Sequence, residues 1–314
     1  MEFTEPHHPN KESHSHHDFS PLDWKDFFNE KRSVTVGDDQ FNVYLKGNSG
    51  TAFLLLHGGG YTGLTWSCFT EELSAKIECQ VIAMDLRAHG ETKTTNDEDL
   101  STESLTQDVA GVYAKIFEHS SERPPLVVIG HSLGGALAVH LINANLVPNV
   151  VAMAVIDVVE GTAMASLSLV THYLTTRPQT FPSCERAIRW CFESGTTRNL
   201  RSARISMPSQ LKPIEGKETL RWRINLAKTQ PHWAGWFSNL SKKFLECRPA
   251  KVLILANTDR LDKELMIGQM KGQFQYEVIA NSGHAVQEDS PARVAEIFVT
   301  LVNRYKPIFK SIKV

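Results

Sequence analysis

Short apolar runs recur along most of the chain and alternate with segments of helical periodicity. Nearly continuous runs of this length are typical of strands that are covered on both faces, since a half-exposed strand would alternate apolar and polar residues. The runs are 53–56, 81–84, 126–129, 150–156, 252–255 and 276–279. Strands that alternate with helices predict an α/β fold with a mostly parallel central sheet flanked by helices.

The two ends of this alternating region carry their own signals. Residues 34–36 and 41–45 are strand-like and are separated by a Gly-Asp-Asp turn, so they predict an antiparallel hairpin. After Pro291, apolar residues follow the spacing i, i+3, i+4, i+7 and i+8, which predicts a helix with one buried face. These residues are Val294, Ile297, Phe298, Leu301 and Val302.

The alternation stops between about residues 162 and 245, where helix-like pieces predominate and no clear strand is visible. We therefore expect a core formed by residues 19–161 and 246–308, with 162–245 as a helical, lid-like insertion after the sixth strand. The insertion has 13 Lys and Arg against 4 Asp and Glu, a net charge of +9 that leaves −11 for the rest of the chain. This charge favours either an acidic partner or a solvated helical surface.

Composition excludes several classes of protein. The 314 residues are 41% hydrophobic and 22% charged with a net charge of −2, which fits one large globular domain and does not suggest nucleic-acid binding. No apolar run reaches the roughly 18 residues that span a bilayer. Residues 1–18 form a polar, His-rich tail, which we expect to be disordered rather than a signal peptide.

The number and spacing of the cysteines indicate the cellular compartment. The five cysteines are an odd number at wide, unpatterned spacings, which argues against a disulfide framework and against a zinc site. A reducing compartment fits this usage, so we expect the protein in the cytoplasm, with the nucleus as a second location.

The segment 130–134 reads Gly-His-Ser-Leu-Gly and places Ser132 directly between a predicted strand and a predicted helix. This is the context of the nucleophile elbow of the α/β-hydrolase fold, in which a strained turn presents the serine hydroxyl at the edge of the sheet. The flanking positions need glycine, because a Cβ atom there would clash where the strand and the helix approach closely. Ser132 is therefore the candidate nucleophile.

The segment 57–60, His-Gly-Gly-Gly, ends an earlier predicted strand. Turns of this type supply one backbone N–H to an oxyanion hole, and the residue after the nucleophile supplies the second. Gly59 and Leu133 are the expected donors. They would stabilise the negative charge that develops on the carbonyl oxygen of the substrate.

A serine hydroxyl needs a base to remove its proton, and chain order in this fold is serine, acid, histidine. His284 follows the last strand run and precedes the final helix, on a loop that can reach the elbow. The acid is either Asp157, after the strand 150–156, or Asp259, after the strand 252–255. Either carboxylate could orient the imidazole, and position alone does not rank the two.

Residues 85–90, Asp-Leu-Arg-Ala-His-Gly, end the predicted strand at 81–84 and are expected to shape the mouth of the site. For Arg87, a structural ion pair and a contact with substrate both remain open.

These motifs together resemble the protein phosphatase methylesterases, and the resemblance extends from Asp18 to about Tyr305. Its most specific part is Ile-Asp-Val-Val-Glu-Gly-Thr-Ala-Met at 156–164. The other segments are 55–60, 85–92, 129–135, 259–262 and 283–286. One departure is Leu133, where relatives often have Met; a residue that acts through its backbone N–H tolerates this change.

The resemblance implies a function and a substrate. Members of this family remove the methyl ester from the carboxyl-terminal leucine of the protein phosphatase 2A catalytic subunit, and they also associate with inactive phosphatase. In the family the acid is the aspartate of the 156–164 segment, which favours Asp157 over Asp259. Neither a metal nor an organic cofactor is implied. Two other hypotheses for the function are a general small-molecule carboxylesterase and a non-catalytic phosphatase-binding protein.

Overall fold

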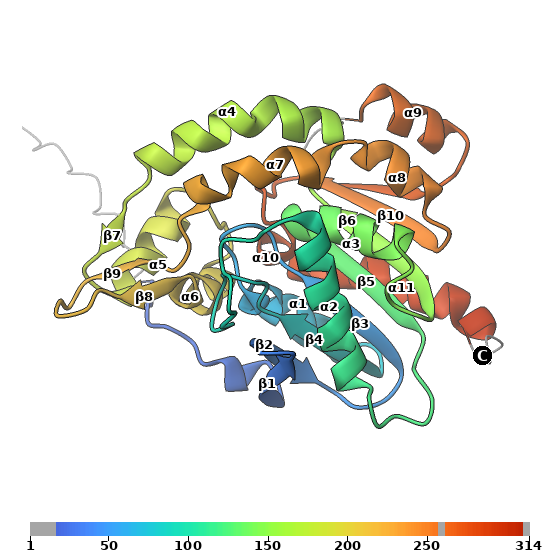
Figure 1. Ribbon diagram of the computed structural model, residues 1–314, viewed down its shortest axis with the longest axis horizontal. Coiled ribbons are helices and arrows are strands. Elements are labelled where there is room, and N and C mark those ends of the chain that lie inside the picture. Colours follow the sequence, from blue (N-terminus) through green and yellow to red (C-terminus); the bar gives the residue numbers. More distant parts are fainter. Residues whose placement is uncertain (1–16, 257–260, 310–314) are drawn as a thin grey trace, which may run out of the picture.

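The computed structural model describes residues 17–256 and 261–309, and its centre is an eight-stranded sheet (Figure 1). The pairs β4–β3, β3–β5, β5–β6, β6–β10 and β10–β11 are parallel, whereas β2 pairs antiparallel with both β1 and β4. In sheet order the strands are β1 (Glu30–Val36), β2 (Asp39–Lys46), β4 (Cys79–Met84), β3 (Thr51–Leu56), β5 (Leu126–His131), β6 (Val150–Ile156), β10 (Ala250–Ala256) and β11 (Gln275–Ile279). The predicted parallel sheet and the amino-terminal hairpin are both confirmed.

Helices cover both faces of this sheet. On one face, α1 (Ser67–Ser74) packs against α11 (Pro291–Phe309), and the rings of Phe69 and Phe298 meet edge to face at 5.8 Å. On the other face lie α2 (Thr102–Ile116), α3 (Leu133–Asn143) and α8 (Leu240–Glu246). Phe298 is completely buried, as the helical periodicity after Pro291 predicts, and its burial stabilises the fold by on the order of 2 kcal/mol.

The segment between β6 and β10 begins with α4 (Glu160–Thr176), a long helix across the top of the molecule in Figure 1. It continues through α5 (Cys184–Glu193), α6 (Leu200–Ser209), the 3-10 turn η3 (Leu226–Thr229) and α7 (Gln230–Phe237) before α8. None of the described helices combines the length and the apolar character that crossing a membrane requires.

Three short strands in this segment were not expected from the sequence. β7 (Thr180–Phe181), β9 (Leu220–Trp222) and β8 (Leu211–Pro213) form a small antiparallel sheet. Strands of two or three residues are too short to show a period of two, so no pattern predicts them. Phe181 and Leu211 pack from this sheet onto α5 and α6, which gives the segment an apolar cluster of its own.

Of the predicted tail, residues 1–16 lie outside the described part of the chain. The residues that follow pack against α6: Asp18 forms an ion pair with Arg204 at 2.7 Å, and the Leu22 N–H donates to the carbonyl of Arg204 at 3.1 Å.

Candidate active site

Ser132 lies in the tight turn between β5 and α3, with φ 52° and ψ −118°. Its N–H donates to the carbonyl of Ile156 at 2.9 Å, which ties the turn to β6. A Cβ atom at Gly134 would collide with the carbonyl oxygen of Leu56, and one at Gly130 with the carbonyl of Gly134. Both glycines of the motif are thus required by close backbone approach, and the strained backbone at Ser132, which costs about 1–3 kcal/mol, is held by the surrounding structure.

His284 and Asp157 meet directly. The Nδ1–H of His284 donates to Oδ2 of Asp157 at 2.7 Å. Asp157 follows β6, and its other carboxylate oxygen accepts from the N–H of Ala256 at 2.9 Å, so neighbouring strands hold the carboxylate in place. The Asp157 side chain is 3% exposed, whereas that of His284 is 52% exposed. With Nδ1 bonded to the carboxylate, Nε2 is left as the ring's proton acceptor.

The alternative acid, Asp259, lies outside the described residues. Among the described residues, the structure joins His284 to Asp157, the aspartate that the family resemblance favours, by a direct hydrogen bond.

Ser132 and His284 line one cavity of about 230 Å³, together with Gly59, Gly60 and Leu133. Much of the remaining wall is aromatic or aliphatic and comes from the segment between β6 and β10. Among the described residues, no hydrogen bond joins the Ser132 hydroxyl to the His284 imidazole. Catalytic hydrogen bonds are often long before substrate binds, so the shared cavity is the relevant relationship between these two side chains.

The glycine turn after β3 borders the elbow, because a Cβ atom at Gly58 would lie 3.2 Å from the Cβ of Ser132. The N–H of Gly60 donates to Nε2 of His89 at 2.9 Å and is therefore occupied. The N–H of Gly59 has no acceptor in the described part of the chain, and Leu133 is the first residue of α3, whose N–H has no intrahelical partner. These two groups match the expected oxyanion donors.

Two buried histidines hold the glycine turn in place. His57 donates from Nδ1 to the carbonyl of Gly58 at 2.8 Å and accepts at Nε2 from the N–H of Leu86 at 3.0 Å. His89 donates from Nδ1 to the carbonyl of Arg87 at 2.8 Å. Burial lowers the pKa of His57 to about 4 and that of His89 to about 3, so both rings are neutral at pH 7 and their tautomers are set by these bonds.

His131, the residue before the candidate nucleophile, is a positioning residue that sequence reasoning missed. It is completely buried, and its Nε2–H donates to the backbone carbonyl of His284 at 2.9 Å. Burial, followed by the neighbouring His284, holds the pKa of His131 well below its usual value. A histidine inside a strand-to-turn motif gives no sequence signal of a partner 153 residues away.

The short helix α10 (Val286–Asp289) anchors the loop that carries His284. Asp289 accepts from the N–H of Gly283 at 2.6 Å, directly before the histidine. Glu288 is buried and accepts from the hydroxyls of Thr65 and Thr197, each at 2.6 Å. Burial raises the pKa of Glu288 to about 7. The loop is thereby joined both to the core, through Thr65, and to the insertion, through Thr197.

Arg87 has a structural role. Its guanidinium makes two hydrogen bonds to Asp108, both at 2.7 Å, and lies 3.1 Å from Asp39. The side chain is 9% exposed and is absent from the lining of the cavity around Ser132. Of the two readings that the sequence left open, the structure supports the ion pair.

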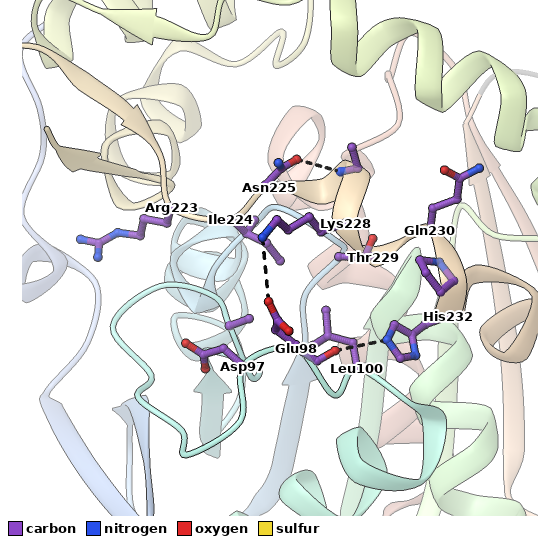
Figure 2. Close-up of a pocket in the computed structure, with 13 residues that line it drawn as sticks. Asp97, Glu98, Leu100, Arg223, Ile224, Asn225, Lys228, Thr229, Gln230 and His232 are labelled. Atoms are coloured by element: carbon purple, nitrogen blue, oxygen red, sulfur yellow. Dashed lines mark hydrogen bonds and ion pairs between the residues drawn. The ribbon is translucent and has the colours of Figure 1, made fainter.

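A second, larger hollow of about 840 Å³ lies outside the Ser132 cavity (Figure 2). It is bordered by the loop at residues 97–100 and by residues 223–232, and Figure 2 shows Lys228 facing Glu98 and His232 bonded to the same loop. Thr229 lines both hollows. The larger hollow is lined by neither Ser132 nor His284, so it is not the candidate catalytic site despite its size.

Comparisons with known proteins agree with this fold. The model of the α/β hydrolase family matches residues 53–297. Among solved structures, E-2-(acetamidomethylene)succinate hydrolase superposes with a TM-score of 0.72 at 20% identity, covering 87% of this chain and 99% of that one. A thioesterase domain from the curacin biosynthetic pathway gives 0.66 at 18% identity, covering 86% and 99%. At these identities the structures support the fold alone.

Closer relatives are found by sequence. A probable protein phosphatase methylesterase 1 of Caenorhabditis elegans is 50% identical over 280 residues, covering 89% of this chain and 76% of that protein. Protein phosphatase methylesterase 1 of Homo sapiens is 43% identical over 334 residues, covering 92% and 86%. The chain therefore belongs to the α/β-hydrolase family and, within it, to the protein phosphatase methylesterases.

Proposed function

We propose that this enzyme is a serine carboxylesterase that removes the methyl ester from the carboxyl-terminal leucine of the protein phosphatase 2A catalytic subunit. The observation that carries the proposal is the Asp157–His284 hydrogen bond beside Ser132 in one cavity. The substrate is inferred from the relatives, whose names describe methylesterases of a protein phosphatase.

The reaction proceeds through an acyl-enzyme. The Ser132 oxygen bonds to the ester carbonyl carbon as its proton passes to Nε2 of His284, and the N–H groups of Gly59 and Leu133 bind the resulting oxyanion. When the tetrahedral intermediate collapses, the carbon–methoxy bond breaks and the methoxy oxygen takes the proton from His284, which releases methanol. Water then attacks the acyl group by the same route, and the leucine carboxylate leaves. Asp157 holds the imidazole throughout.

Exposed apolar side chains on α4 support a protein rather than a small molecule as the substrate. Leu169 is 68% exposed, and Val170 and Tyr173, which also line the cavity, are 38% and 43% exposed. A contiguous exposed apolar surface commonly marks a protein-binding site. A protein that inserts its carboxyl terminus into this cavity would cover α4.

The direct test measures the methyl ester itself. Methylated phosphatase is incubated with the enzyme, and the mass of the carboxyl-terminal peptide is followed together with methanol release. Demethylation by the wild type and none by Ser132→Ala supports the proposal. A general carboxylesterase would instead turn over simple aryl esters and leave the phosphatase methylated.

A second candidate is a phosphatase-binding protein whose site is not assembled in the free state. The Ser132 hydroxyl, which has no hydrogen bond to His284 in the described structure, favours it. A fluorophosphonate distinguishes the two, since it labels Ser132 only where the serine is activated. Labelling of the free protein would reject this candidate.

We also propose that the protein is located in the cytoplasm and the nucleus, which fractionation of cells can test.

A further inference from the structure

Arg177 is a cation in the wall of the active-site cavity. It ends α4, where its N–H donates to the carbonyl of Tyr173 at 3.0 Å. Its guanidinium lies 3.9 Å from the centre of the Trp222 ring, and both side chains line the cavity that contains Ser132. The ring supports the guanidinium from one face through a cation–π contact and leaves its edge available for hydrogen bonds.

The charge of Arg177 has no acidic partner in the described part of the chain. Its Nε atom is buried without a hydrogen-bond acceptor, and no Asp or Glu occurs among the described residues that line the cavity. Burial lowers the pKa of Arg177, because the cation has lost water without gaining a counterion. An unpaired, partly desolvated charge is costly, so an anion from outside the chain would complete this site.

Three other arginines of the basic insertion already have acidic partners. The guanidinium of Arg204 also donates to the carbonyl of Ser20 at 2.7 Å, and that of Arg189 also lies over the ring of Phe19. The pairs are Arg189–Glu193, Arg201–Glu71 and Arg204–Asp18. Glu71 and Asp18 lie outside the insertion, so the net charge of the insertion overstates its capacity to attract an acidic partner, whereas Arg177 retains that capacity inside the cavity.

The position of Arg177 along α4 indicates which anion it meets. Leu167, Val170 and Leu174 line the cavity with it, at spacings that place all four on one stripe of the helix. α4 begins at Glu160, just after Asp157, and its 17 residues measure about 25 Å. Because Arg177 lines the same cavity as Ser132 and His284, its guanidinium lies nearer to them than the length of the helix. An extended chain of about five residues spans roughly 17 Å, so a side chain within about five residues of the ester can face Arg177. In the substrate the carboxyl group that reacts at Ser132 is a methyl ester and carries no charge, so the anion that faces Arg177 is another carboxylate of the peptide.

We propose that Arg177 is a specificity residue that binds an acidic side chain of the polypeptide substrate, within about five residues before the esterified carboxyl terminus. This inference rests on the proposed methylesterase function. The carboxylate would replace the missing counterion, and the planar guanidinium could bind it through two parallel hydrogen bonds.

The test uses peptides that end in leucine methyl ester and come in matched pairs, with Asp or Asn at one of the five preceding positions. Methanol release gives kcat/KM for the wild type, for Arg177→Met and for Arg186→Met, an exposed insertion arginine outside the cavity. We expect the wild type to prefer one Asp peptide over its Asn partner by about tenfold. Arg177→Met should remove the preference by slowing only the Asp peptide, and Arg186→Met should retain it.

Equal rates of the wild type on the Asp and Asn peptides of every pair would overturn the proposal. An equal loss of rate on both peptides of a pair in Arg177→Met would also overturn it, because a purely structural arginine would give that result. Protection of Ser132 from a fluorophosphonate by the same peptides with amidated ends supplies a second readout. This protection measures whether Arg177 distinguishes Asp from Asn peptides even if no methyl ester is hydrolysed. A failure of the proposed methylesterase function can therefore be told apart from a failure of the proposal for Arg177. Protection that needs a free terminal carboxylate and is lost in Arg177→Met would assign the arginine to the product and overturn the side-chain proposal.

Discussion

The imidazole of His131 donates a hydrogen bond to the backbone carbonyl of His284 at 2.9 Å, and the two rings lie 4.6 Å apart. The candidate base is thus held from two sides, by Asp157 through its ring and by His131 through its backbone. Because His131 precedes Ser132 in the chain, the same short segment presents the nucleophile and locates the loop that carries the base.

Replacing His131 by Phe should lower kcat by about tenfold, since one buried hydrogen bond that orients the His284 loop is lost. The melting temperature should fall by only a few degrees, because the His284 carbonyl loses its donor while the apolar ring removes the buried Nδ1 that lacks a partner. His131→Gln, whose amide can donate to the same carbonyl, should recover part of the rate. Steady-state kinetics and calorimetry on both variants check this. A loss of melting temperature that parallels the loss of rate would instead indicate a packing role.

Asp157→Asn tests the assignment of the acid. An amide at this position favours the wrong tautomer of His284 and removes the charge that stabilises the imidazolium, so kcat should fall by about 10,000-fold with KM little changed. Binding of the phosphatase should persist. The same substitution at Asp259 is the matched control: activity that disappears with Asp259→Asn and survives Asp157→Asn would reverse the assignment.

The sequence could identify both candidate acids but could not rank them from position alone, and the topology explains why. Asp157 follows β6, and Asp259 lies beyond β10, which is the parallel neighbour of β6. Neighbouring parallel strands end at the same edge of the sheet, so the sequence positions after β6 and β10 are equally suited to carry the acid. Only the direct hydrogen bond to Asp157, or the family resemblance, separates them.

The long parallel strands and the elbow were predictable because each has a local signature: a continuous apolar run, or glycines at fixed offsets from Ser132. Arg177 and His131 have none. Their importance lies in what is near them in space, an aromatic ring at position 222 and a carbonyl at position 284. The small sheet of the insertion escaped prediction for a related reason, since its strands are shorter than any recognisable period.

Glu288 should make the stability of the protein depend on pH between 5 and 8. Burial raises its pKa from 4.5 to about 7, and the neighbouring Asp289 adds to the shift. A folded-state pKa above the unfolded value means that the native state holds the proton more tightly, so the contribution of Glu288 to stability is full below pH 4.5 and is lost as the pH rises through 7. The loss by pH 8 is about 3 kcal/mol.

Glu288→Gln should remove this dependence. The amide stays neutral and can still bond to the hydroxyls of Thr65 and Thr197, so the variant should be more stable than the wild type at pH 8 and similar to it at pH 5. Urea unfolding at both pH values measures the difference. A variant that is destabilised equally at pH 5 and pH 8 would show that the carboxylate is tolerated in its ionised form.

The exposed face of α4 should matter only for a protein substrate. Leu169→Glu places a charge on a side chain that is 68% exposed and does not line the cavity, so folding and hydrolysis of a small aryl ester should be unchanged. Demethylation of the intact phosphatase should slow by at least about fivefold, mainly through KM, because docking against α4 would bury a charge. Met270→Glu is the matched control, since Met270 is 83% exposed on α9 (Lys263–Met270), away from the cavity lining. If both variants demethylate the phosphatase at the wild-type rate, the docked protein does not cover α4, and the apolar side chains of that helix serve only to enclose the cavity.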